Sequence, residues 1–115
     1  MATLPNARLA VVDPRKIEAY LLSRQHLDGA AKAAFFESFG FSTSTWEVLA
    51  DALRDHAATN SVQSVYQTPF GEIFEVNGRL PSPDGRNPVV LVVWIITNSE
   101  DYPRLVTAVP SEEGP

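Results

Sequence analysis

Two residues in the first third of the chain, His26 and Lys32, carry side chains suited to acid–base and phosphate chemistry. An imidazole donates or accepts a proton near neutral pH, and an ammonium stabilises negative charge on a phosphate. His26 precedes a predicted helix over residues 29–39 and Lys32 lies in its first turns, where backbone N–H groups favour anions. The pair is suited to metal-free cleavage of RNA by its own 2′-hydroxyl. The alternative is a loop histidine and a solvated lysine, both common on protein surfaces.

The rest of the sequence lacks the motifs of cofactor and metal sites. It has no cysteine, and it contains no H-x-x-x-H pair, no glycine-rich phosphate loop and no nucleophile elbow. We therefore expect no metal and no cofactor. His56 lies near the end of a third predicted helix, and we interpret it as an exposed residue that interacts with the helix dipole.

Arg104 and Thr107 lie on the last predicted strand with opposite parity. In a regular strand this spacing places them on opposite faces, so that only one of the two can face a given groove. Thr107 has the larger apolar neighbours on its side, which favours a buried hydroxyl bonded to the backbone.

Composition indicates one soluble globular domain. The chain has 115 residues, of which 44% are hydrophobic and 20% charged, and a formal net charge of −5 that disfavours broad, non-specific binding to nucleic acid. The first ten residues, MATLPNARLA, lack the apolar region of a signal peptide. The longest apolar run, residues 88–96, is far shorter than the ~20 residues that span a bilayer. We expect a cytoplasmic protein that does not contact membranes.

Three helices are predicted before any strand, over residues 14–23, 29–39 and 44–58. Asp13 followed by Pro14 is typical of a helix start, and Gly40 of a left-handed helix end. The third helix begins with a capping-box pattern from Ser44 to Glu47.

Four strands follow, over residues 61–67, 72–80, 89–96 and 104–109, joined by turns of which Ser82-Pro83-Asp84-Gly85 is the clearest. The order predicts an α+β domain in which three N-terminal helices pack on a four-stranded antiparallel sheet. We divide it into an N-terminal arm (1–10), a helical half (13–58), the sheet (61–110) and a disordered tail (111–115).

The third predicted strand, around Trp94, is apolar on both faces. Three short helices cover one face of such a sheet, and the other face has no obvious cover. Two alternatives are open for this second face. Either loops and the third helix cover it, or it forms a ligand cleft or the interface of a homodimer.

From Leu4 to Pro110 the chain resembles a family of small bacterial domains that are found alone beside tiny partner genes or at the C-termini of large secreted toxins. The resemblance rests on Asp13-Pro14, His26, Gly29, Lys32-Ala33, Gly40-Phe41, Pro83-Asp84-Gly85-Arg86, Trp94 and Leu105-Val106-Thr107-Ala108. That family looks like a member of the barnase–EndoU–colicin–RelE group of metal-independent ribonuclease toxins, which have N-terminal helices on a four-stranded antiparallel sheet.

The resemblance implies an endoribonuclease, a hydrolase-like toxin that acts on RNA and pairs with a small antitoxin-like protein. It implies His26, Lys32 and Thr107 as catalytic residues, and Arg86 and Arg104 as contacts of the substrate. Ala30 and Ala31 stand where the family carries basic residues, which weakens phosphate binding. Two alternatives remain: a non-catalytic interaction module that uses the sheet face around Trp94, and an immunity protein, for which acidity is the argument.

Overall fold

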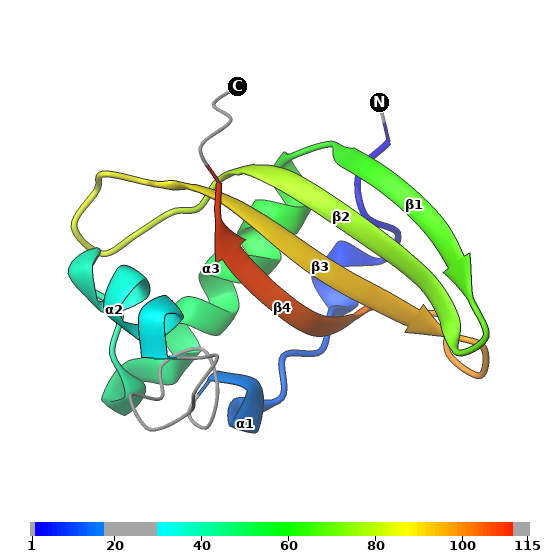
Figure 1. The fold of residues 1–115 in the computed structure, drawn as a ribbon, viewed down its shortest axis with the longest axis horizontal. Helices are drawn as coiled ribbons and strands as arrows, with labels where there is room; N and C mark the ends of the chain where they lie inside the picture. Colours follow the sequence, from blue (N-terminus) through cyan, green and yellow to red (C-terminus); the bar gives the residue numbers. More distant parts are fainter. Residues whose placement is uncertain (1, 18–29, 112–115) are drawn as a thin grey trace.

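The structure is a computed structural model, and it describes residues 2–17 and 30–111. It confirms the predicted α+β fold, with helices in the N-terminal half and an antiparallel sheet in the order β1-β2-β3-β4 (Figure 1). The helical segments are the 3₁₀ turns η1 (Ala7–Leu9) and η3 (Thr43–Thr45) and the helices α1 (Pro14–Lys16), α2 (Ala30–Ser38) and α3 (Trp46–Thr59). The strands are β1 (Val62–Thr68), β2 (Gly71–Arg79), β3 (Val89–Thr97) and β4 (Arg104–Pro110).

Two of the three predicted helix boundaries follow from side-chain chemistry as expected. The Asp13 carboxylate accepts a hydrogen bond from the Arg15 backbone N–H at 2.9 Å, with Pro14 in the first turn of α1. Gly40 has a φ of 101°, the left-handed conformation that ends α2 without a Cβ clash. The predicted capping box of α3 is wrong, because a 3₁₀ turn precedes the helix and the capping hydroxyl is that of Ser42, which accepts from the Ser44 N–H at 3.2 Å.

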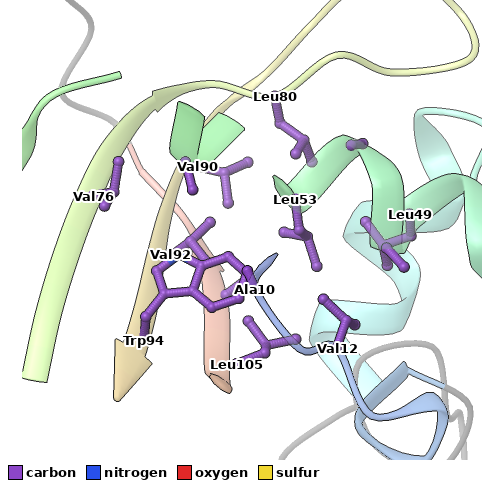
Figure 2. Close-up of a cluster of buried hydrophobic side chains, with 14 of the residues drawn as sticks. Ala10, Val12, Leu49, Leu53, Val76, Leu80, Val90, Val92, Trp94 and Leu105 are labelled. Carbon is purple, nitrogen blue, oxygen red and sulfur yellow. The ribbon is translucent and has the colours of Figure 1, made fainter. Parts of the chain in front are cut away.

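The core lies between one face of the sheet and α3, as Figure 2 shows. Trp94 is 0% exposed at its centre, flanked on β3 by Val90 and Val92 and faced by Leu49 and Leu53 of α3. On α3 the buried residues recur at intervals of three and four, which gives the helix one apolar stripe against the sheet. The face of β3 that carries Trp94 is therefore the face that α3 covers.

The predicted N-terminal arm is part of this core. Leu4 and Ala10 are buried, and Val11 forms a parallel bridge with Arg104. The Val11 N–H donates to the Pro103 carbonyl at 2.8 Å, and the Leu105 N–H donates to the Val11 carbonyl at 3.0 Å. The N-terminal segment thereby protects the outer edge of β4. The predicted tail lies outside the described residues from position 112 onward.

The sheet face opposite α3 is formed on β3 by Leu91, Val93 and Ile95, all of them half-buried. The predicted interaction face around Trp94 is therefore wrong in its residues, since the Trp94 side belongs to the core. Within residues 2–17 and 30–111, no helix has the length and apolar character needed to cross a membrane.

Candidate functional site

The structure brings together two of the predicted site residues, Lys32 of α2 and Thr107 of β4. The Lys32 Nζ donates a hydrogen bond to the Thr107 Oγ1 at 3.2 Å, across 75 positions of sequence. Ala33 and Phe36 bury one side of α2, which leaves Lys32 at the margin of that side with its long side chain directed to β4. An ammonium is therefore held at a defined position beside the edge strand, half-buried and next to a hydroxyl.

An extra residue in β4 determines which side chains accompany Thr107. Thr107 is paired with Val93 and Leu105 with Trp94, so Val106 has no partner on β3. This register shift reverses the alternation of side chains, as β-bulges do. Arg104 lies opposite Ile95, two residues from Val93, and so shares a sheet face with Thr107. The predicted separation of the two onto opposite faces is wrong because it assumed a regular strand.

Arg104 is held by a carboxylate in the turn that precedes β4. Its Nε and Nη2 both donate to Glu100, with an Nη2 to Oε2 distance of 2.6 Å. Glu100 also accepts hydrogen bonds from the Thr97 and Tyr102 hydroxyls at 2.8 and 2.9 Å. These bonds, that of Arg104 foremost, lower the pKa of Glu100 to about 2, and Glu100 in turn raises the pKa of Arg104. A phosphate that binds Arg104 has to compete with this carboxylate.

The sequence analysis assigned no role to Glu100, which lies between the third and fourth predicted strands. The available signal was its position four residues before Arg104, beside Tyr102. In a helix, oppositely charged residues four positions apart commonly form an ion pair. Across a hairpin turn, whether two such residues meet depends on the geometry of the turn.

Arg86 lies at the opposite end of α2. Its Nε donates to Asp84 at 2.6 Å, its Nη2 donates to the carbonyl of Ser38, and its guanidinium lies 4.3 Å from the centroid of the Phe39 ring. Ser38 follows Lys32 by six residues, roughly 9 Å along a helix axis. Arg86 thus fastens the β2–β3 loop to the last turn of α2, and its described contacts do not include Lys32 or Thr107. His26 lies outside the described residues.

His56 is placed quite differently from its prediction. It is 0% exposed, and its Nε2 donates to the Val90 carbonyl at 2.9 Å. A carbonyl can only accept, so a hydrogen lies on Nε2, and Nδ1 has no hydrogen-bond partner among the described residues. Burial lowers the pKa of His56 below the usual 6.5, an effect that the Val90 and Gly78 backbone groups partly oppose. The exposed-residue interpretation is wrong because α3 turns this face toward β3.

We expect this buried histidine to make stability depend on pH. The folded-state pKa is lower than the unfolded-state value of 6.5, so the unfolded chain binds more protons below that pH. The free energy of unfolding should fall as pH drops from about 6.5 toward the folded-state pKa, by at most about 1.4 kcal/mol per pH unit. Urea unfolding at several pH values between about 5 and 7.5 measures this slope.

His56→Gln should flatten that slope, since glutamine retains an N–H for Val90 and does not titrate. His26→Gln, which removes the other histidine, is the matched control and should preserve the slope. The carboxylates with lowered pKa values, Asp13, Asp84 and Glu100, contribute only at lower pH. A slope that persists in His56→Gln and disappears in His26→Gln would contradict the assignment.

A shallow groove of about 320 Å³ lies between α3 and the β2–β3 loop. Its lining includes two carboxylates, Asp51 and Asp55, which pair with Arg54 and Arg8 respectively. Carboxylates repel phosphate, so this groove does not suit a nucleic-acid backbone. Within the described ranges, no group of three or more His, Cys, Asp or Glu residues could hold a metal ion.

These features define a small α+β domain in which a lysine–threonine contact joins a helix to the edge strand of an antiparallel meander. The chain belongs to the family described as domain of unknown function DUF6883, whose model matches residues 3–112.

A solved structure with a similar fold is the contact-dependent growth inhibition toxin–immunity protein complex from Klebsiella pneumoniae 342. The similarity has a TM-score of 0.72 and covers 94% of this chain and 98% of that chain, at 17% sequence identity. At this identity the similarity establishes the fold alone. No curated protein matches the chain.

Proposed function

We propose that this protein is a metal-independent endoribonuclease, the toxin of a bacterial toxin–antitoxin pair that acts on RNA in the cytoplasm. The observation that carries the proposal is the contact between Lys32 of α2 and Thr107 of β4. It fixes a cation beside a hydroxyl on the edge of the sheet, the arrangement needed to neutralise charge that develops on a phosphate.

The proposed reaction uses the substrate's own nucleophile. A base removes the proton of the ribose 2′-hydroxyl, the 2′-oxygen bonds to phosphorus, and the bond to the 5′-oxygen breaks as that oxygen gains a proton. The products are a 2′,3′-cyclic phosphate and a 5′-hydroxyl. His26 serves as the acid or base, Lys32 stabilises the phosphate oxygens, and Thr107 holds the ammonium in place. Arg86 and Arg104 contact flanking phosphates, each giving up part of its bond to Asp84 or Glu100.

The structural relative supports the biological setting of this proposal. Its title names a growth inhibition toxin together with an immunity protein, and this chain covers 98% of the matched chain. A toxin of this kind needs a small protein partner that blocks it. An immunity protein is the second candidate, favoured by the formal net charge of −5, which repels RNA and suits a basic toxin.

A third candidate is a non-catalytic interaction module. The observation in its favour is the aliphatic row of Leu91, Val93 and Ile95, which remains partly exposed on the sheet face opposite α3. Such a row provides a surface for another protein without any chemistry.

RNA cleavage without metal separates these candidates. If the protein is the toxin, its induction without a partner should slow growth, and the purified protein should cleave RNA in EDTA and leave 2′,3′-cyclic phosphate ends. His26→Ala should reduce that rate by roughly 10²–10⁴ if His26 is the acid or base. A wild type that is as harmless as His26→Ala and cleaves no RNA would refute the nuclease and leave the two binding candidates.

A further inference from the structure

Exposed apolar side chains concentrate at one edge of the sheet. Among residues 2–17 and 30–111, five large hydrophobic residues are strongly exposed, and three of them lie on β1 or in the turn that follows it, namely Val65 (50%), Tyr66 (48%) and Phe70 (75%). In Figure 1, β1 forms the outer border of the sheet on the side away from β4. The edge of β1 therefore combines open backbone groups with apolar side chains.

From Ser64 onward this edge lacks the features that usually prevent strands from pairing. The start of β1 differs, because the register with β2 shifts between Val62 and Ser64. Exposed edge strands in soluble proteins commonly carry charges or proline, or are covered by another segment. β1 reads VQSVYQT, with no charged residue and no proline. Its one backbone hydrogen bond to a described residue outside β2 runs from the Val62 N–H to the Ala2 carbonyl at 2.9 Å. The segment from Ser64 to Thr68 has no such cover among the described residues.

The opposite edge of the same sheet is protected in each of these ways. Val11 pairs with β4 along its first residues, Arg104 places a charge there, and Pro110 ends the strand. Of the two edge strands, β4 is therefore protected, whereas β1 leaves its outer backbone groups exposed from Ser64 onward.

We propose that β1 pairs with β1 of a second copy of this chain, in antiparallel orientation about a two-fold axis. With Val65 on the axis, Ser64 of one copy lies opposite Tyr66 of the other, and Gln63 lies opposite Gln67. Every opposed pair is uncharged, so no like charges meet although the chain as a whole carries −5. Two acidic residues of β2 lie opposite this segment: Glu72, which is bonded to the Gln67 side chain at 2.9 Å, and Glu75, which is the partner of Ser64.

The length of the strand limits the strength of this pairing. Five residues from Ser64 to Thr68 bury less surface than a stable interface of about 1,000 Å² or more requires, even with the Tyr66 ring added. The dimer is therefore weak and reversible, with a dissociation constant on the order of 10⁻⁵–10⁻⁴ M. This inference does not depend on the proposed nuclease activity.

Sedimentation equilibrium of the intact chain tests the proposal. The average mass should rise with concentration from 12.6 kDa toward twice that value. Val65→Lys and Val65→Glu each place two like charges across the axis and should each remain at the monomer mass. An equimolar mixture of the two variants should recover the dimer, because opposite charges then meet. Circular dichroism of each variant checks that it is folded.

Val48→Lys on α3 is the matched control, since Val48 is 44% exposed and lines the groove between α3 and the β2–β3 loop. It should dimerise like the wild type. A wild type that stays monomeric throughout the range, a dimer unaffected by either Val65 charge, or open-ended aggregation in place of a dimer overturns the proposal. Failure of the mixture to dimerise overturns the two-fold pairing about Val65.

Discussion

Lys32→Met should lower the rate of RNA cleavage by about 10²–10³-fold, the usual loss when a donor to developing negative charge is removed. The Lys32 ammonium is held beside the Thr107 hydroxyl at 3.2 Å, so its position is fixed before substrate arrives. Methionine keeps most of the length and apolar surface of lysine without the charge. Single-turnover cleavage of a defined RNA in EDTA measures the rate.

Lys16→Met is the matched control, because it removes one of the two lysines of the chain from α1 instead of α2. It should leave cleavage within a few-fold of the wild type. Thr107→Val removes only the hydroxyl that accepts from Lys32 and should cost about tenfold, the value of one hydrogen bond to a charged group. Thr107→Ser should restore the rate. Equal rates for wild type and Lys32→Met would remove Lys32 from the mechanism.

Trp94→Ala should lower the free energy of unfolding by about 3–5 kcal/mol, which is a large part of the stability of a small domain. Trp94 is 0% exposed and lies between β3 and α3, so its removal leaves a cavity that a close-packed core cannot refill. Urea unfolding followed by circular dichroism measures the loss.

Trp94→Phe should cost much less than Trp94→Ala. It retains an aromatic ring and removes the indole Nε1–H, which is buried without a hydrogen-bond partner among the described residues. Leu9→Ala, at a side chain that is 66% exposed, should change the free energy of unfolding by no more than about 0.5 kcal/mol. If Trp94→Ala unfolds at the same urea concentration as Leu9→Ala, Trp94 does not organise the core.

The order of elements could be predicted from local chemistry. Asp13-Pro14 and Gly40 determine helix ends through interactions within two or three residues, and both behave as predicted. The strands follow from β-branched runs between turns, and each observed strand begins or ends within a residue or so of its prediction. These features depend on contacts between residues that are close together in the sequence, so local sequence patterns are enough to predict them.

The site depended on features that no local pattern specifies. The unpaired Val106 adds one residue to β4 and thereby places Arg104 and Thr107 on one face. His56 is buried because of how α3 crosses the sheet, and a carbonyl on β3 satisfies its ring. Both outcomes are set by the packing of segments that are distant in sequence. The assignment of Lys32 and Thr107 to one catalytic site rested on family resemblance for the same reason.

The 75 positions between Lys32 and Thr107 have a consequence for the protein during its synthesis. At 5–20 residues per second, a ribosome needs about 4–15 s after adding Lys32 before it adds Thr107. Throughout that interval the cation has no edge strand beside it, and Val11 has no β4 to pair with. A nascent chain that has not yet reached Thr107 therefore cannot form the lysine–threonine contact. Any site that depends on this contact is absent during those seconds of translation.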